Sequence, residues 1–487
     1  MHITPVVIVP HGLGPAGWVD ALTHVAASLT SHHDLPLAIR LPGAAVEHVS
    51  QAEPGLWSSV TAHDIDWLAG GFSDPILVTL PDQARAAQLR RERTAMDTAG
   101  IGPRGIWIGD FWAPDLVSLV IEEEHTLMLL DGSLVPTAPA RPGVVERAGV
   151  TVTAVAVVDE LSGPAESDGM TALRVAAADL EALTTSHSGR LISPSGYLAE
   201  HLPGARLKPR TDTPAIPAEV ESFYRKVLLL TADMGDRVPG QDILLGLQTR
   251  EMLHPGGPRK SEHQELIASR VAFDRSRHRG ESWVVVEEVD WDADGVDEVH
   301  IQSATSGLVV DPTSGTLETW DDKVSQWPIT AVEPSRPGTL IRRSTADGLE
   351  PPPEPLHVQR REEGRGEALL IMESPRGVVC RVEIRGRSLS WEVSLDDAAT
   401  HRVGPEIPIA MDGARLRVDG GDWMNTDEPV ATMGHRFRLA DHERTLIIEA
   451  PRPCELFTHP LPGRGLVIWP HWVTSTDSAY RVTFTPT

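Results

Sequence analysis

The sequence predicts a multidomain α/β and β protein, in which an α/β domain is followed by a short helical domain and a C-terminal β-sandwich. At 487 residues the chain is too long for one compact core. Its first part alternates short apolar runs with segments of helical period, whereas from about Gly280 the apolar residues recur at every second position. This pattern predicts three domains: the α/β domain at residues 1–212, the helical domain at 213–278 and the β-sandwich at 279–487.

The first domain is expected to hold a parallel sheet with helical crossovers, closed or nearly closed as a barrel, because strands and helices alternate along it. The strand candidates are Val6–Val9, Leu37–Ile39, the segment before Gly70, Gly105–Ile108, Thr126–Leu130 and Val152–Val158. The helix candidates between them are Trp18–Thr30, Pro81–Ala99 and Met170–Leu183.

The rest of the chain changes pattern twice. A Pro-rich passage, Lys208–Pro217, leads into Glu219–Arg277, where i, i+3, i+4 apolar spacing indicates a few packed helices. Beyond Gly280, alternating runs such as SWVVVEEV and RTLIIEA favour a β-sandwich. The Pro-, Glu- and Arg-rich stretch Gly348–Gly366 is expected to be a surface loop inside it.

Composition restricts the kind of partner. A net charge of −26 argues against nucleic acid and anionic membranes, which are bound by basic patches, so a neutral ligand fits better. Thirteen Trp residues stand against three Tyr; exposed Trp can hold sugars, although most are expected in cores. Two cysteines, Cys380 and Cys454, support neither a disulfide framework nor a thiolate metal site.

No apolar run of about 20 residues is present, so no membrane span is expected. The opening MHITPVVIVPHG has the pattern of a buried strand rather than of a signal peptide. We therefore expect a cytoplasmic protein, and the sequence leaves its oligomeric state open.

Polar residues follow the predicted strands in the same sense, and parallel strands bring such ends to one rim. Asp110 follows the buried run GIWI and is flanked by Trp107 and Trp112. The alternative is that Asp110 caps a helix that begins at Pro114. The residues expected to share one carboxylate-lined cleft are His11, Asp74, Asp110, Asp131, Asp159 and Glu160.

The chain resembles glycoside hydrolase family 57, the α-amylases and 4-α-glucanotransferases. The segment Gly70–Pro75 (GGFSDP) is similar to the family's Gly-Gly-x-x-Glu-Pro segment, and Trp107–Asp110 (WIGD) to its Trp-x-x-Glu nucleophile motif. Val157–Glu160 lies where the family has its acid/base Asp, and Ile192–Leu198 is similar to a stretch common after that motif. The resemblance implies an incomplete (β/α)7 barrel, with the helices near Leu247–Arg250 in the place of the family's helical domain.

The resemblance implies activity on α-glucan oligosaccharides by hydrolysis or 4-α-glucanotransfer, with Asp110 as nucleophile, Asp159 as acid/base and no required cofactor. It also implies that His11, Asp74, Trp107, Trp112 and Glu160 contact the substrate. Whether Asp159 or Glu160 is the acid stays open. A two-carboxylate mechanism needs one protonated and one ionised group across the glycosidic bond.

The chain departs from the family pattern at several motif positions. This chain has Pro10-His11-Gly12 where the family has His-Gln-Pro, and it has Asp74 and Asp110 where the family has Glu. Shortening Glu to Asp retracts the carboxylate by about 1.5 Å. In retaining enzymes the two carboxyl groups are about 5–5.5 Å apart, and this retraction moves their separation toward the roughly 6.5–9.5 Å that is typical of inverting enzymes. These departures favour either a slow or inverting enzyme or a degenerate relative that binds carbohydrate or a protein partner without turnover.

A separate acidic turn in the third domain resembles the first half of a calcium loop. Asp290, Asp292 and Asp294 alternate, and Gly295 occupies the sixth position. Because the twelfth position is Ile301 rather than Glu, an EF-hand is excluded. A structural Ca²⁺ in a β-domain loop and a solvated acidic turn both remain open.

Overall fold

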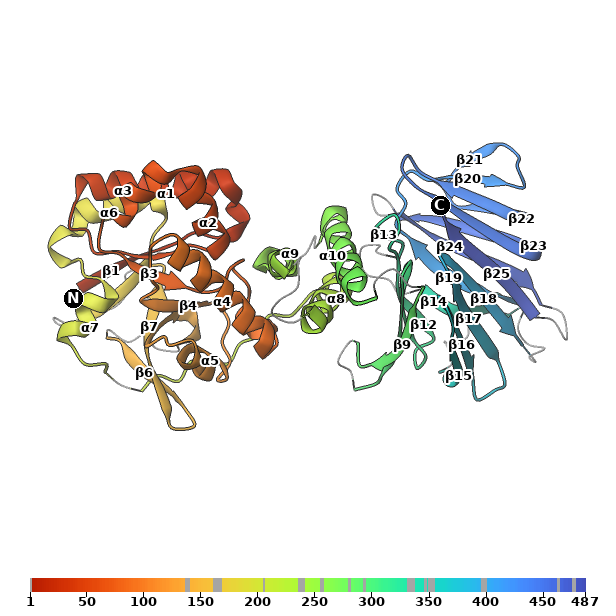
Figure 1. Ribbon diagram of the computed structural model, residues 1–487, viewed down its shortest axis with the longest axis horizontal. Coiled ribbons are helices and arrows are strands. Elements are labelled where there is room, and N and C mark those ends of the chain that lie inside the picture. Colours follow the sequence, from red (N-terminus) through yellow and green to blue (C-terminus); the bar gives the residue numbers. More distant parts are fainter. Residues whose placement is uncertain are drawn as a thin grey trace. The chain divides into compact units, whose positions relative to one another are not determined.

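The computed structural model of the chain describes residues 2–135, 141–160, 169–204, 206–234, 241–254, 258–278, 282–291, 295–330, 338–345, 348, 355–395, 401–461, 465–474 and 479–487. The chain forms two compact units (Figure 1). The first unit comprises Met1–Ile216 with Val227–His254, and the second comprises Pro217–Lys226 with Pro255–Thr487.

Seven parallel strands of the first unit pair in a closed ring, in the order β1, β2, β3, β4, β5, β7, β8 and back to β1. The predicted incomplete (β/α)7 barrel, with its parallel sheet closed or nearly closed, is thus confirmed. An eighth strand, β6, pairs antiparallel with the first half of β7, which leaves the second half of β7 for β8. The strands are β1 (His2–Ile8), β2 (Ala38–Arg40), β3 (Asp66–Ala69), β4 (Gly105–Gly109), β5 (Leu127–Asp131), β6 (Gly143–Arg147), β7 (Val150–Val158) and β8 (Met170–Arg174).

One element of the barrel was predicted wrongly. The segment Met170–Leu183 was expected to be a helix because it is rich in Ala, but its first five residues form β8, and helical structure begins only at the 3-10 turn η4 (Ala177–Asp179), which leads into α6 (Leu180–His187). Pairing of β8 with both β1 and β7 closes the ring, and this tertiary requirement overrides local propensity. The error matters because β8 ends at Arg174, which lies at the centre of the candidate site.

Helices cover the outside of the ring, and α1, α2 and α3 lie side by side (Figure 1). Trp18 and Leu22 of α1 pack into one core cluster with Val7 of β1 and Ile39 of β2. The predicted helices Trp18–Thr30 and Pro81–Ala99 are confirmed as α1 and α4. The remaining bounds are α1 (Gly14–Ser31), α2 (Gly43–Ala52), α3 (Pro54–Thr61), α4 (Asp82–Thr98), α5 (Leu116–Glu122) and α7 (Pro194–Glu200), with 3-10 turns η1 (His11–Leu13), η2 (Leu77–Thr79), η3 (Gly132–Leu134), η4 (Ala177–Asp179) and η5 (Ser188–Arg190).

A buried histidine gives the first unit a defined pH dependence. His125, 7% exposed between α5 and β5, has its pKa lowered from 6.5 to about 4 by burial and by the nearby charge of Arg93. Because the folded pKa lies below the unfolded one, its contribution to stability is complete above pH 6.5 and is lost as the pH falls toward 4. We expect thermal denaturation to report a loss on the order of 3 kcal/mol over that range. The variant His125→Leu should reduce the pH dependence, whereas His24→Gln, an exposed control, should not.

The helical elements that the described residues form after the barrel strands are α8 (Ala218–Met234), α9 (Gln241–Gly246), η7 (Arg250–Leu253) and α10 (Lys260–His278). The residues from Val227 to His254 belong to the first unit, and α10 belongs to the second. The sequence interval expected to form a helical domain therefore contributes to both units. None of the helices in the described ranges is long and apolar enough to cross a membrane.

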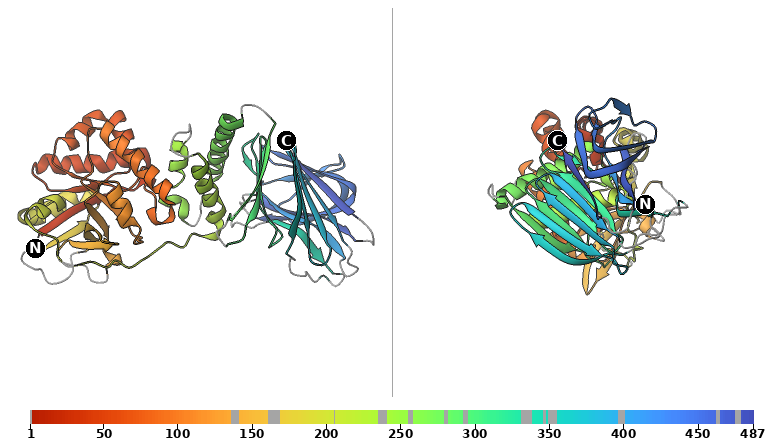
Figure 2. Two further views of the ribbon diagram at one scale, coloured as in Figure 1. Left: turned by 60° about the horizontal axis from the view of Figure 1, so that its bottom comes forward. Right: turned by 90° about the vertical axis from the view of Figure 1, so that its right-hand side faces the viewer.

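The second unit is built from two antiparallel sheets on one core, seen as broad twisted layers in Figure 2. The predicted β-rich C-terminal domain is thus confirmed. The sheets share an edge, because β24 pairs with β19 of the first sheet and with β23 of the second. The first sheet holds β9 (Val284–Val289), β10 (Glu298–Ser303), β11 (Ser306–Asp311), β12 (Thr316–Asp322), β13 (Trp327–Pro328), β14 (Gly338–Ser344), β19 (Arg402–Ile409) and β24 (Gly465–Val473). The second holds β15 (His357–Glu363), β16 (Glu367–Glu373), β17 (Val379–Arg385), β18 (Ser388–Ser394), β20 (Arg415–Val418), β21 (Trp423–Asn425), β22 (Val430–Ala440), β23 (Thr445–Leu461) and β25 (Ala479–Pro486).

The predicted surface loop Gly348–Gly366 contains a strand, so that prediction was wrong in part. His357–Glu363 forms β15 and pairs with β16 along its whole length. Most side chains of β15 are exposed, and its Arg- and Glu-rich composition concealed the strand because it carries no apolar alternation.

Candidate active site

The parallel strands of the barrel deliver four charged residues to one rim. Asp110 follows β4, Asp131 ends β5, Asp159 follows β7 and Arg174 ends β8. These strands are neighbours in the ring, and their carboxyl ends lie at the same edge. The structure therefore brings together three of the acids that were expected to share a cleft, around an arginine that the sequence analysis missed.

Arg174 is the common partner of the three acids. Its Nη2 donates a short hydrogen bond to Asp131 Oδ2 and lies 3.9 Å from Asp110 Oδ1, and its Nε lies 3.3 Å from Asp159 Oδ1. The guanidinium carbon also lies 5.4 Å from the centre of the Trp107 ring. A single guanidinium thus ties together the ends of three strands, so a disaccharide-sized ligand could contact both Asp110 and Asp159.

A local irregularity of β4 sets the direction of Asp110. The register between β4 and β5 shifts between Trp107 and Gly109, and Gly109 has a φ of +91°. Such a bulge re-aims the side chain that follows. Asp110 Oδ2 accepts a 2.5 Å hydrogen bond from Arg250 Nη1, and the Asp110 side chain is 40% exposed. With Oδ2 occupied, Oδ1 is the oxygen that faces Arg174 across a wider gap.

Gly109 is required at this bulge for two independent reasons. Its positive φ is disfavoured for residues with a Cβ, and a Cβ placed there would lie 2.9 Å from Arg250 Nη2. We expect Gly109→Ala to cost about 1–3 kcal/mol in urea unfolding and to displace Arg250 from Asp110. Gly102→Ala is the matched control, since a Cβ there meets no atom within 4 Å.

Arg250 reaches the rim from η7, which lies outside the barrel sequence. Thr249 pairs with Pro75 in an isolated antiparallel bridge, and the backbone N–H of Arg250 donates to the carbonyl of Asp74. The next residue, Glu251, accepts a 2.9 Å hydrogen bond from the backbone N–H of Gly12 through Oε1. The segment Thr249–Glu251 is therefore fastened to two strand-end loops and to Asp110 at once.

Asp74 belongs to a buried network beneath the rim. Its φ is +57° and it is 6% exposed, and its Oδ1 lies 3.7 Å from Arg40 Nη2. Arg40 forms an ion pair with Glu92 at 2.9 Å, and both side chains are fully buried. Glu92 Oε2 accepts hydrogen bonds of 2.7 Å from the backbone N–H groups of Gly70 and Gly71. Asp74 is thus held in place by this network rather than standing free in an open cleft.

His11 lies on the short turn η1 after β1. Its ring stacks at a tilt against Trp18, with centroids 5.5 Å apart. Burial lowers the pKa of His11, while the charges of Glu251 and Asp74 oppose that shift. A neutral imidazole near these acids can accept or donate one hydrogen bond, which suits contact with a sugar hydroxyl.

The structure also places the predicted site residues Trp112 and Glu160, and it decides whether Asp110 caps a helix. Trp112 is 2% exposed and packs in a core cluster, which does not favour the predicted contact with substrate; that contact stays a prediction. Glu160 is exposed, and residues 161–168 after it lie outside the described residues. Asp110 does not cap the following helix, because α5 begins at Leu116 with Asp115 in the capping position.

The structure describes only part of the predicted calcium loop. Asp292 and Asp294 lie outside the described residues, and Asp290 Oδ2 accepts a 3.2 Å hydrogen bond from the N–H of Gly295. Within the described ranges, no group of three or more His, Cys, Asp or Glu side chains is arranged to hold a metal ion. The calcium loop stays a prediction.

The missed residues Arg174 and Arg250 left different traces in the sequence. Arg174 follows the apolar run MTAL and could have been found by counting it as another strand end. Arg250 lies 140 residues from Asp110 in the chain and carries no local signal of that contact.

No protein-family model matches the chain, but a short segment is similar in sequence to alpha-amylases and the fold is similar to that of a 4-alpha-glucanotransferase. The chain is 26% identical over 109 residues to an alpha-amylase of Pyrococcus horikoshii, covering 21% of this chain and 17% of that protein. It is 24% identical over 106 residues to alpha-amylase 1 of Dictyoglomus thermophilum, covering 20% and 16%. The matched segment thus spans about a sixth of the length of these curated relatives.

The fold match extends over the whole chain. The crystal structure of 4-alpha-glucanotransferase from Thermococcus litoralis superimposes with a TM-score of 0.76, covering 99% of each chain at 12% sequence identity. The chain therefore shares the fold of that glucanotransferase over its whole length, and a short segment of it is similar in sequence to alpha-amylases.

Proposed function

We propose that this protein acts on α-linked glucan oligosaccharides, by hydrolysis or 4-α-glucanotransfer, at the rim of its barrel. The observation that carries the proposal is the position of Asp110, Asp131 and Asp159 around Arg174 in a chain with the complete fold of a 4-alpha-glucanotransferase. Carboxylates on neighbouring strand ends are the groups that glycosidic bond cleavage requires. The substrate is neutral, in keeping with the chain's net charge of −26.

In this proposal Asp110 is the nucleophile. Arg250 holds Asp110 Oδ2 by a charge-assisted hydrogen bond and leaves Oδ1 to face the sugar. Trp107 is 5% exposed and packs in a core cluster, so it supports the guanidinium of Arg174 from below. His11, on the turn after β1, supplies a polar contact to a hydroxyl group of the glucan, and the buried Asp74 helps to hold the loop that carries Arg250.

The acid is either Asp159 or Glu160, and single variants decide between them. The side chain of Asp159 is 73% exposed and lies by Arg174, whereas Glu160 is exposed at the next position. We expect Asp159→Asn to slow the cleavage of maltoheptaose by roughly 10²–10⁴-fold, and Glu160→Gln to leave it within a few-fold of wild type. Cleavage should be followed by chromatography of the products. The reverse pattern would transfer the acid role to Glu160.

A second function, binding of α-glucan without turnover, is favoured by one specific observation. Each of the three rim acids lies beside an arginine, and Asp159 is not enclosed by apolar groups in the described structure. An efficient general acid is usually held in an apolar setting that keeps it protonated. Maltoheptaose should bind in both cases, and calorimetry with parallel product analysis separates them. Binding without products supports the second function, whereas products support the first.

A further inference from the structure

The second unit carries an arginine-rich surface around its most exposed tryptophan. Strands β20, β21 and β22 pair side by side, with Arg417 opposite both Trp423 and Arg438. Leu416 alternates with these residues and points into the core. We call the outward-facing set Arg415, Arg417, Trp423 and Arg438 the Trp423 patch.

Trp423 is unusual among the tryptophans of this protein. It is 36% exposed, and it is the only tryptophan among the described residues that counts as an exposed large apolar side chain. The guanidinium carbons of Arg415 and Arg438 lie 5.4 Å and 5.8 Å from the centre of its ring. Two cations from two different strands therefore converge on one exposed indole, a contact worth about 0.5–1 kcal/mol at an exposed site.

No ion pair within the described residues of the unit neutralises the charges of this patch. Neither Arg415 nor Arg438 forms an ion pair with any carboxylate in the described part of the chain. Arg417 donates to the carbonyls of Gly420 and Gly421, which fixes the turn after β20 but leaves its charge uncompensated. In a protein with a net charge of −26, these three arginines form a cluster of cations on one face of the sheet.

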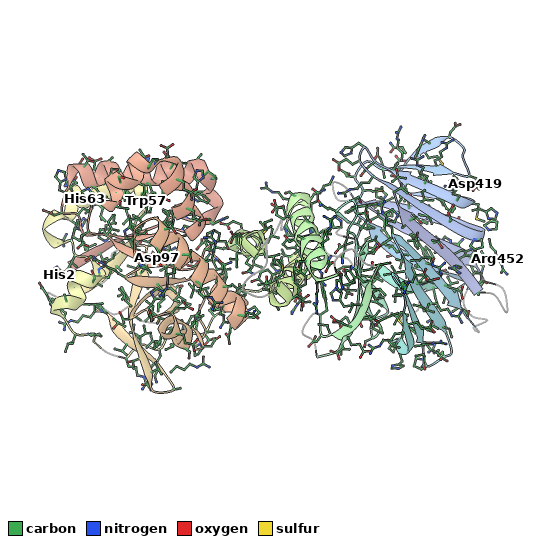
Figure 3. The ribbon with its side chains drawn as sticks, viewed as in Figure 1. His2, Trp57, His63, Asp97, Asp419 and Arg452 are labelled. Carbon is green, nitrogen blue, oxygen red and sulfur yellow. The ribbon has the colours of Figure 1, made fainter. Side chains whose placement is uncertain are left out.

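Asp419, one of the acids near the patch, is engaged in backbone hydrogen bonds. This residue, labelled in Figure 3, accepts them from the backbone N–H groups of His435 and Arg436 at the bulge of β22. The side chain of Arg436 is paired with Glu449 at 3.2 Å. These contacts hold the strands in register, so Arg415 and Arg438 are presented on a rigid support rather than on a loose loop.

We propose that the Trp423 patch binds phosphorylated α-glucan, with a phosphate group between Arg415 and Arg438 and a sugar ring against Trp423. Guanidinium groups match phosphate oxygens in pairs, and an indole offers a flat apolar surface to a pyranose. The glucan part of this ligand rests on the proposed function, whereas the anionic part rests on the patch alone. The alternative is that the arginines only protect the edge strand β21 from pairing with other chains.

The test measures binding of three probes by calorimetry to the full chain in an Asp110→Asn background, which excludes turnover. The probes are maltoheptaose carrying a 6-phosphate, unmodified maltoheptaose and inorganic phosphate. With the barrel saturated by unmodified maltoheptaose, the phosphorylated probe should still bind, and its affinity should fall as salt rises. Inorganic phosphate should bind at least about tenfold more weakly, because it lacks the sugar.

The variant R415Q/R438Q should weaken the phosphorylated probe by at least about tenfold, and Trp423→Ala should weaken it by several-fold. R381Q/R481Q is the matched control: it removes two exposed arginines from the same sheet that are paired with Glu392 and Glu383. Unchanged binding in R415Q/R438Q, or an equal loss in the control, overturns the proposal. Self-association of R415Q/R438Q without any loss of probe binding assigns the arginines to edge protection and also overturns it.

The binding measurements distinguish a failure of the patch proposal from a failure of the proposed function. If unmodified maltoheptaose fails to bind anywhere while the phosphorylated probe binds and depends on Arg415 and Arg438, the patch stands and the barrel assignment fails. If the barrel binds maltoheptaose and the phosphorylated probe gains nothing from the two arginines, the reverse holds.

Discussion

Replacing Asp110 with Asn is expected to reduce the turnover of maltoheptaose by at least about a thousandfold and to leave its binding within a few-fold of wild type. The amide keeps the shape of the side chain and can still accept a hydrogen bond from Arg250 through its oxygen, so the rim should stay in place. It cannot form the glycosyl ester, nor can it act as a base toward water. Product formation and calorimetric affinity should be measured on the same preparations.

Asp64→Asn is the control for that experiment, because Asp64 is exposed and paired with Arg104 away from the rim. It should leave both turnover and binding unchanged. Wild-type turnover in Asp110→Asn would remove Asp110 from the chemistry. It would also remove the main reason for assigning the reaction to this rim.

Replacing Arg40 with Met is expected to cost about 3–5 kcal/mol of the free energy of unfolding. The substitution removes the cation that compensates Glu92, and both side chains are fully buried. The carboxylate of Glu92 would then remain in the interior, with only the N–H groups of Gly70 and Gly71 as partners. Urea unfolding of the full chain, followed by a signal from the first unit, measures the loss.

Arg91→Met is the matched control, since Arg91 is the neighbour of Glu92 on α4. Arg91 pairs with Glu47 and Asp242 at the surface, and its side chain is 23% exposed. Exposed or half-exposed pairs are typically worth 0–1 kcal/mol, so the control should cost about 1 kcal/mol or less. Equal losses for the two variants would show that burial of the Arg40–Glu92 pair is not what stabilises the loop after β3.

The sequence predicted most of the barrel because its strands are short, largely apolar runs separated by segments of helical period. The run GIWIG became β4 and placed Asp110 at the rim, as expected from the position of an acid after a buried strand. The strand β8 escaped prediction because its five residues are as compatible with a helix as with a strand, and only pairing with β1 and β7 decides between them. Arg174, the residue that gathers the rim acids, was lost with it.

Contacts between distant segments account for the remaining differences. Arg250 reaches Asp110 from η7 because the segment is fastened to the loops at Gly12 and Asp74, and no local pattern encodes that attachment. The burial of Glu92 left a partial trace, since α4 places the polar residues Arg85, Gln88 and Glu92 on its buried face. Trp112 was expected at the rim from its neighbours in sequence, but the chain turns it into the core.

The most direct test of the central claim is a crystal structure of Asp110→Asn soaked with maltoheptaose. The account predicts a glucan chain at the barrel rim, with one sugar against residue 110 and Arg174 and within reach of Asp159. A glucan bound only elsewhere on the protein, or a rim that stays empty at saturating maltoheptaose, would contradict it.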